Sequence, residues 1–538
     1  MAEATNTTKT ADFDAIVVGG GFAGIYMVHR LRNLMGMTVR AYEAGSGIGG
    51  TWFWNRYPGA RCDIQSMEYS YQFSEELQQE WEWSERFATQ PEILKYANHV
   101  AERFDLMKDI QLNTPVASTI YDDATALWTV TTASGEVKTA RFVVMATGCL
   151  SSANLPNIKG RDSFKGDTYH TGKWPHEGVD FTGKRVAVIG TGSSAIQSIP
   201  LIAQQAKHLT VFQRTASFTV PAHNQPLDPE FVRDFKSRYK EIRTHNWQQP
   251  FGQDFGSFGE SALKISETER NDIYEKQWQK GGLSFMGTFD DLMFDRVANE
   301  TAAEFIRTKI RGIVQDPAVA DALAPRQIVG CKRLCVDTGF YDTFNRPNVT
   351  LVPLDNNPLE EITATGVRTG KGLVEVDVVV FATGFDAMTG AVSKIDVRGT
   401  GGRTLQDKWA EGPKTYLGLA TAGFPNMFFV TGPGSPSVLS NMLPSIEQHV
   451  EWIAECIDHV STHQGRTIEA LPESEETWVH HVNDVAHTTL YPNCNSWYLG
   501  ANVPGKVRVF MPYIGVNTYV DKCRDVVAKG YEGFRIAR

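Results

Sequence analysis

The sequence predicts an α/β protein that contains two Rossmann-like dinucleotide-binding domains, the second of which is interrupted by a helical insertion. Two observations lead to this prediction. The chain has 538 residues, more than one hydrophobic core usually organises, so it should divide into domains. A short apolar segment, a glycine-rich turn and a helical pattern also follow one another twice, at residues 15–31 and 185–203. This order is typical of a nucleotide-binding βαβ unit.

The first glycine-rich turn has the spacing that a dinucleotide pyrophosphate requires. Gly19 permits the tight turn, Gly21 lets the backbone approach the phosphates, and Gly24 allows the helix to pack closely on the strand. The N-terminus of that helix would donate backbone N–H groups to the phosphates. A second strand, predicted at residues 38–42, ends at Glu43, whose carboxylate can accept a hydrogen bond from a ribose 2′-hydroxyl. The first turn therefore predicts a site for FAD or NAD.

The second turn carries the opposite charge at the corresponding position. It follows a strand predicted at residues 185–189, and its predicted phosphate-binding residues are Gly190, Gly192, Ser193, Ser194 and Ala195. Arg214 stands as far beyond Ala195 as Glu43 stands beyond Gly24. A guanidinium at this point, assisted by the hydroxyl of Thr215, favours a 2′-phosphate through charge-assisted hydrogen bonds. We therefore expect NADPH rather than NADH in the second site.

Two further strands predict how the chain passes between the domains. The strands expected at residues 142–145 and 376–381 both run into the sequence Ala-Thr-Gly, and a glycine after a strand lets the backbone approach a neighbour or a cofactor closely. Between Pro221 and Pro325 the chain is rich in charged helical patterns and poor in strands. We therefore expect an FAD-binding domain of residues 1–152 and 387–538, an NADP-binding domain of residues 153–220 and 330–386, and a helical insertion of residues 221–329.

Composition and charge restrict the possible partners. A net charge of −10 disfavours nucleic acid, which requires a basic surface. No apolar run reaches the length of a membrane span, and residues 1–10 are polar and lack the apolar core of a signal peptide. The seven cysteines show no metal-ligand spacing, so we expect no metal site and only reduced thiols. These features predict a cytoplasmic monomer or weak dimer that binds small molecules.

Two longer motifs connect the chain to a known family. Residues 164–175 fit the pattern FxGxxxHxxxW(P/D), and residues 49–63 fit GGxWxxxx(F/Y)PGxxxD without a gap. With these motifs the chain resembles the type I Baeyer–Villiger monooxygenases, most closely the branch of phenylacetone, steroid and cyclohexanone monooxygenases. The resemblance extends from about residue 12 to the C-terminus. It implies FAD in the first site and NADPH in the second.

The resemblance also implies a reaction and roles for individual residues. NADPH reduces FAD, the reduced flavin reacts with O2 to form a C4a-peroxide, and the peroxide anion attacks a ketone to give an ester or lactone. Arg333 resembles the arginine that stabilises the peroxide and the oxyanion of the adduct, Asp63 the carboxylate that orients this arginine, and Lys332 a contact of the 2′-phosphate. Trp497 resembles the tryptophan of a mobile loop that covers the nicotinamide. Further cofactor contacts are implied for Thr51, Trp52, Tyr69, Val116 and Met442.

Other interpretations of the same motifs are weaker. His170 and Trp174 are expected to couple the domains rather than to perform chemistry. A flavin monooxygenase that oxidises amine or sulfide heteroatoms would share both glycine turns, but Phe164 and the Trp174-Pro175 ending favour ketone oxidation. A flavin-bound redox sensor without turnover is the alternative outside enzymes. A pyridine-nucleotide disulfide reductase would need a CxxC motif beside the flavin, and the sequence has none.

The sequence does not determine which ketone is used. Residues 432–441 resemble the longer active-site loop of the phenylacetone branch. This likeness hints at bulky or aryl ketones.

Overall fold

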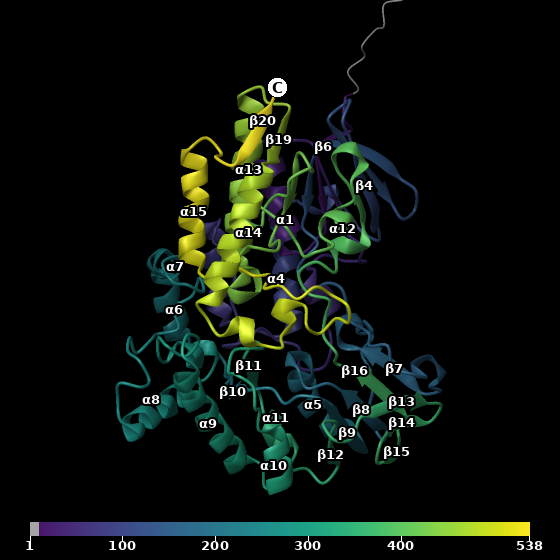
Figure 1. Ribbon diagram of the computed structural model, residues 1–538, viewed down its shortest axis with the longest axis vertical. Helices are drawn as coiled ribbons and strands as arrows, with labels where there is room; N and C mark the ends of the chain where they lie inside the picture. The colour runs from purple at the N-terminus through teal and green to yellow at the C-terminus, as the bar shows by residue number, and fades with distance from the viewer. Residues whose placement is uncertain (1–9) are drawn as a thin grey trace, which may run out of the picture.

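The computed structural model describes residues 10–538 and is built around two mainly parallel β-sheets, one in each half of Figure 1. The first sheet has the order β17-β4-β5-β6-β1-β2-β3, with β18 paired to β6. Its strands are β1 (Phe13–Val18), β2 (Val39–Tyr42), β3 (Ile110–Gln111), β4 (Val116–Asp122), β5 (Leu127–Thr132), β6 (Val137–Met145), β17 (Asp396–Arg398) and β18 (Met427–Phe429). Segments that are far apart in the chain therefore share one sheet.

The predicted polar segment of residues 1–10 lies, except for its last residue, outside the described residues.

The second sheet has the order β12-β9-β8-β16-β7, and all of its strand pairs are parallel. Its strands are β7 (Asp167–His170), β8 (Arg185–Ile189), β9 (His208–Gln213), β12 (Val349–Pro353) and β16 (Val378–Phe381). The strand predicted at residues 185–189 is confirmed with the same bounds. A small antiparallel sheet of β13 (Leu359–Thr363), β14 (Gly366–Thr369) and β15 (Gly372–Glu375) was not predicted.

Helices of both chain ends cover the first sheet. The early ones are α1 (Phe22–Val28), which continues as a π-helical segment over His29–Leu34, α2 (Thr51–Trp54), α3 (Glu75–Glu80) and α4 (Gln90–Arg103). The late ones are α12 (Leu405–Lys408), α13 (Met442–Thr462), α14 (Pro472–His487) and α15 (Val516–Ala528), and β20 (Phe534–Ala537), near the C-terminus, pairs antiparallel with β19 (Thr467–Ala470). Every residue of α1 is buried, because α1 packs between its own strand and α13 (Figure 1). Among the described residues, no helix is both long and apolar enough to cross a bilayer.

The second sheet carries α5 (Ser193–Gln205), and a group of helices from the middle of the chain lies to the left of α5 in Figure 1. These are α6 (Pro229–Ser237), α7 (Tyr239–Asn246), α8 (Glu267–Lys280), α9 (Arg296–Ile313) and α10 (Pro317–Leu323). Side chains of Asp228, Ser266, Asp295 and Asp316 cap the starts of α6, α8, α9 and α10. The prediction of a helical, strand-poor segment between Pro221 and Pro325 is confirmed. The chain then returns through β11 (Cys335–Asp337), which pairs with β10 (Thr219–Pro221), and α11 (Phe340–Thr343).

The prediction that all cysteines are reduced is wrong for one pair. Cys331 and Cys494 form a disulfide whose Cα atoms lie 5.3 Å apart, within the usual range for such a bridge. The two residues are 163 positions apart in sequence, so local spacing gave no sign of the pairing. The other five cysteines are free and buried.

The two Ala-Thr-Gly segments have the same place in each sheet. Gly19 and Gly190 both have φ = +116°, and a Cβ atom on either would collide with the carbonyl oxygen of Ala146 or Ala382, respectively. Each phosphate-binding turn therefore lies directly against the end of the neighbouring strand, and only glycine fits at its first position. The repeated motif follows from this shared packing.

Candidate active site

A two-point ion pair between Asp63 and Arg333 lies at the centre of the predicted site. Nε of Arg333 donates to Oδ2 of Asp63 at 2.6 Å, and Nη2 donates to Oδ1 at 2.8 Å. Nη1 donates to the backbone carbonyl of Val438 at 3.0 Å. Burial acts to lower the pKa of Arg333, but the charge and hydrogen bonds of Asp63 hold it above its ordinary value. The guanidinium is therefore permanently charged and fixed in orientation.

The two halves of this pair come from different hydrophobic cores. Cys62 and Ile64, on either side of Asp63, pack in the core of the first sheet. Leu334 and Cys335, directly after Arg333, pack in the core of the second sheet. The ion pair thus joins the two halves of the molecule. The sequence predicted both residues as site residues, and the structure brings them together.

The first glycine turn faces the Gly-Gly of the second motif. Gly49 N–H donates to the carbonyl of Gly20 at 2.9 Å, and a Cβ atom on Gly21 would lie 3.4 Å from the Cα of Gly50. Glu43 is buried and accepts hydrogen bonds from the backbone N–H groups of Gly20 (2.6 Å) and Gly45 (2.7 Å). Two backbone turns without side chains therefore lie opposite each other beside a carboxylate, which fits the pyrophosphate and ribose of a dinucleotide.

The other residues predicted to contact the flavin lie around this turn. Trp52 Nε1 donates to the hydroxyl of Tyr69 at 3.0 Å, and both side chains are buried. Thr51 is exposed at the first position of α2. Val116 begins β4, two residues after Thr114, whose N–H donates to the carbonyl of Glu43. The structure thus groups Trp52 with Tyr69 and places Val116 at the Glu43 end of the turn.

The second glycine turn is more open. Gly192 precedes α5, has φ = −84°, and a Cβ atom on it would meet no atom within 4 Å. Ser193 Oγ lies 3.2 Å from the thiol of Cys335, Ser194 Oγ lies 3.0 Å from the hydroxyl of Thr171, and Ala195 is fully buried. Because the start of α5 faces open space at Gly192, its backbone N–H groups have room for a phosphate.

Two cations lie near this turn. Arg214 and Thr215 are exposed directly after β9. Burial lowers the pKa of Lys332, and the charge of Arg214 lowers it further. Within residues 10–538, neither cation forms an ion pair with a carboxylate. Two like charges close together without a protein counter-ion fit a bound phosphate, as predicted for NADPH.

His170 and Trp174 connect segments rather than face the ion pair. His170 Nδ1 accepts from the N–H of Gly172 at 2.9 Å, and Nε2 lies 3.3 Å from the hydroxyl of Thr383. That hydroxyl donates to the carbonyl of Asn154 at 2.6 Å. Trp174 is buried against Tyr169 and Phe181. These contacts agree with a coupling role, which stays a prediction.

Trp497 and Met442 share one apolar cluster beside Arg333. Trp497 begins a short 3-10 helix, and its ring centroid lies 4.2 Å from that of Tyr498. Met442 begins α13, and both side chains pack on the cluster that contains Val438. The sequence did not predict that the carbonyl of Val438 binds Arg333. Residues 432–441 were recognised as an active-site loop, but a backbone contact leaves no signal in the side chains.

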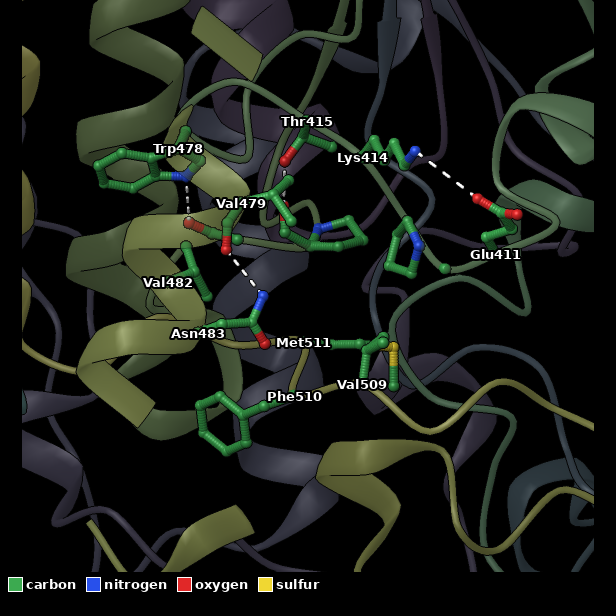
Figure 2. Close-up of a pocket in the computed structure, with 14 residues that line it drawn as sticks. Glu411, Lys414, Thr415, Trp478, Val479, Val482, Asn483, Val509, Phe510 and Met511 are labelled. Atoms are coloured by element: carbon green, nitrogen blue, oxygen red, sulfur yellow. Dashed lines mark hydrogen bonds and ion pairs between the residues drawn. The ribbon is translucent and has the colours of Figure 1, made fainter. Parts of the chain in front are cut away.

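Figure 2 shows a small hollow of about 70 Å³ that borders the start of this loop. Trp478 Nε1 donates to the carbonyl of Gly434 at 3.0 Å, and Thr415 Oγ1 donates to that of Pro433 at 2.5 Å. Neither Asp63 nor Arg333 lines this hollow. Its walls hold the start of the loop in place, so they contribute to the site indirectly.

Comparisons with known proteins agree with this geometry. The profile of the pyridine nucleotide-disulphide oxidoreductase family matches residues 16–251. A Baeyer–Villiger monooxygenase from Pseudooceanicola batsensis is 45% identical over 98% of this chain and 97% of that protein. The phenazine N-monooxygenase PhzNO1 from Lysobacter antibioticus is 45% identical over 97% of this chain and 96% of that protein. A solved structure of oxidized steroid monooxygenase bound to NADP has a TM-score of 0.93 and 50% identity, covering 98% of this chain and 99% of that one.

The two turns should separate the binding of the two cofactors. Gly21→Val would fill the space between the facing turns, so the purified protein should be colourless or lose flavin readily. Gly192→Val adds its side chain to open space and should give a stable, yellow protein that NADPH reduces poorly. Flavin absorbance and anaerobic reduction by NADPH measure both results. A fully yellow Gly21→Val protein would contradict the assignment of FAD to the first turn.

Arg214 should determine the choice of coenzyme. Loss of one charged phosphate contact typically costs about 1.5–3 kcal/mol, or roughly ten- to a hundredfold in affinity. Arg214→Ala should therefore raise the KM for NADPH by about that factor and leave the use of NADH nearly unchanged. Steady-state kinetics with both coenzymes provide the measurement. Equal losses with NADPH and NADH would rule out a 2′-phosphate at Arg214.

Proposed function

Because this chain belongs to the family of FAD- and NADP-dependent Baeyer–Villiger monooxygenases, we propose that Asp63 and Arg333 carry the ketone chemistry of its site. Baeyer–Villiger oxidation converts a ketone to an ester or lactone with O2 and NADPH. The observation that supports this proposal is the two-point ion pair, which keeps a charged guanidinium beside the cofactor-binding turns. When bound, reduced FAD supplies the activated oxygen atom.

The residues of both turns fit the two cofactors. Gly19, Gly21 and Gly24 with Glu43 would hold the adenosine diphosphate half of FAD, with Val116 at the Glu43 end, and Thr51, Trp52, Tyr69 and Met442 would contact the rest of the flavin nucleotide. The start of α5, from Gly190 to Ala195, would hold the pyrophosphate of NADPH. Arg214, Thr215 and Lys332 would hold its 2′-phosphate, and Trp497 would cover the nicotinamide side. The open space at Gly192 and the unpaired cations support this assignment.

Arg333 would act where negative charge develops. When an anionic oxygen attacks a carbonyl carbon, the negative charge moves from the attacking oxygen to the former carbonyl oxygen, and a fixed guanidinium stabilises the charge at both positions. Asp63 orients the guanidinium and raises its pKa. The carbonyl of Val438 accepts a hydrogen bond from the remaining guanidinium nitrogen, Nη1. The surrounding apolar cluster, which includes Tyr498 and Met511, would exclude water from the reacting atoms.

Oxygenation of a heteroatom is the second candidate function. It is favoured by the similarity to the phenazine N-monooxygenase. Nitrogen or sulfur must attack an electrophilic oxygen, whereas a ketone requires a nucleophilic, anionic one. A permanent positive charge at Arg333 stabilises the anion, so the electrostatics of the site favour ketones.

The alternative outside enzymes is a flavin-bound redox sensor without turnover. NADPH consumption that rises on addition of ketone would exclude such a sensor.

Several finer assignments belong to the same proposal. Bulky ketones are proposed as substrates, on the basis of residues 432–441 and the similarity to a steroid monooxygenase.

The proposed domain division is an FAD domain of residues 1–152 and 387–538, an NADP domain of residues 153–220 and 330–386, and an insertion of residues 221–329. The membership of β17 and β18 in the first sheet and of β16 in the second supports it. A cytoplasmic monomer or weak dimer is also proposed; the five free thiols fit a reducing compartment, whereas the disulfide between Cys331 and Cys494 does not.

Arg333→Ala should separate binding from chemistry. The variant should keep FAD, but ester formation should fall at least a hundred- to a thousandfold, because loss of one preorganised donor to an oxyanion costs about 3–4 kcal/mol. Asp63→Ala should have a smaller effect, with some NADPH oxidation persisting as hydrogen peroxide release. Stopped-flow flavin absorbance combined with product analysis measures both. An Arg333→Ala enzyme that makes ester at the wild-type rate would remove Arg333 from the mechanism.

A further inference from the structure

We propose that Gln197 is a positioning residue that fixes Asp63 against Arg333 by joining the Asp63 loop to the coenzyme-binding helix α5. This inference rests on the proposed function of the ion pair. Gln197 is a half-buried residue of α5, one turn after Ser193; the apolar side chains of α5 pack in the second core, whereas the residues on either side of Asp63 pack in the first core. The position of this loop relative to Arg333 must therefore be set by contacts across the boundary.

Gln197 makes three hydrogen bonds with the motif that ends at Asp63. The hydroxyl of Tyr57 donates to its Oε1 at 2.8 Å, and the backbone N–H of Arg61 donates to the same oxygen at 3.4 Å. Its Nε2 donates to the carbonyl of Arg61 at 3.0 Å. Both the oxygen and the nitrogen of the Gln197 amide are thus used. They bind the backbone N–H and the backbone carbonyl of Arg61, which stands two residues before Asp63. An amide is the side chain that can accept and donate in this way.

The backbone of the loop lies directly on α5 at the same point. A Cβ atom on Gly59 would collide with the carbonyl oxygen of Gln197 and would lie 3.3 Å from the side chain of Leu201. The Tyr57-Pro58-Gly59 part of the motif is therefore a docking segment for the helix. Burial raises the pKa of Tyr57 above its usual range, which keeps the phenol protonated as a donor.

The same face of α5 also contacts the Arg333 segment. Ser193, four residues before Gln197, lies 3.2 Å from the thiol of Cys335, and this thiol contacts the carbonyl of Arg333 at 3.4 Å. Residues four apart lie on one face of a helix. One helical turn therefore contacts the two segments that carry the ion pair, the Arg333 segment through Ser193 and Cys335 and the Asp63 loop through Gln197 and Arg61. The start of this turn is also the proposed phosphate site.

This arrangement predicts what the loss of Gln197 would do. Without its hydrogen bonds, the Asp63 loop keeps its core packing but loses its alignment with Arg333. Misplacement of a catalytic group by about 1 Å can cost on the order of a hundredfold in rate. Because Asp63 itself acts by orientation, we expect about a tenfold loss of ester formed per NADPH, with a matching rise in hydrogen peroxide. FAD binding should not change.

The test uses the holoenzyme with substitutions that separate hydrogen bonding from packing. Gln197→Met keeps the length of the side chain and removes all three hydrogen bonds. Gln197→Glu keeps the acceptor for Tyr57 and loses the donor to Arg61, so its coupling should be intermediate. Gln204→Ala, at an exposed position on the same helix, is the matched control and should behave like the wild type. FAD content, Tm, ester and peroxide are measured for each protein.

A double-mutant cycle with Asp63→Ala distinguishes positioning from general destabilisation. If Gln197 acts through Asp63, Gln197→Met should cause no further loss of coupling in the Asp63→Ala enzyme. Wild-type coupling in Gln197→Met, or losses that add in the double variant, would overturn the inference while leaving the proposed function intact. A wild-type enzyme that makes no ester from any ketone would overturn the proposed function itself, and this inference with it.

Discussion

The ion pair between Asp63 and Arg333 is the interaction on which the rest of the site depends. The chain neighbours of its two residues pack in different hydrophobic cores, so its geometry depends on how the two halves of the molecule fit together. A guanidinium with two hydrogen bonds to one carboxylate has a single orientation. The Val438 carbonyl accepts a further hydrogen bond from the guanidinium, and we propose that the contacts of α5 with the Asp63 loop maintain the same orientation. A site arranged in this way supplies a fixed positive charge, and a fixed charge favours reactions that develop an anion.

The two predicted dinucleotide sites share the same backbone geometry, although the expected ligands differ. Gly19 and Gly190 have the same φ angle and approach equivalent carbonyl groups, those of Ala146 and Ala382. We propose that selectivity comes instead from the side chain that ends the following strand. Glu43 is buried and bound to backbone N–H groups, whereas Arg214 is exposed and close to Lys332. The fold is therefore repeated, and the charge is what differs between the sites.

Local patterns predicted most of the fold and the proximity of two proposed site residues, Asp63 and Arg333. The strand at residues 185–189, both turns, the helical insertion and the pair of Asp63 and Arg333 could be predicted, because strand periodicity, glycine spacing and family motifs are local in sequence. The disulfide between Cys331 and Cys494, the Val438 carbonyl contact and the role of Gln197 could not. Each depends on residues that are brought together only by the tertiary fold, and two of them involve backbone atoms that no side-chain pattern records.

The most direct test of this account is a competition within one molecule that carries both a ketone and a thioether. The wild-type enzyme would be supplied with NADPH and O2, and the ratio of ester to sulfoxide would be measured by mass spectrometry. A permanent cation at Arg333, held by Asp63, predicts that ester predominates and that the ratio falls in Asp63→Asn. If sulfoxide predominates in the wild type, the charge at Arg333 does not determine the chemistry, and if Asp63→Asn leaves the ratio unchanged, Asp63 does not hold that charge in its working position.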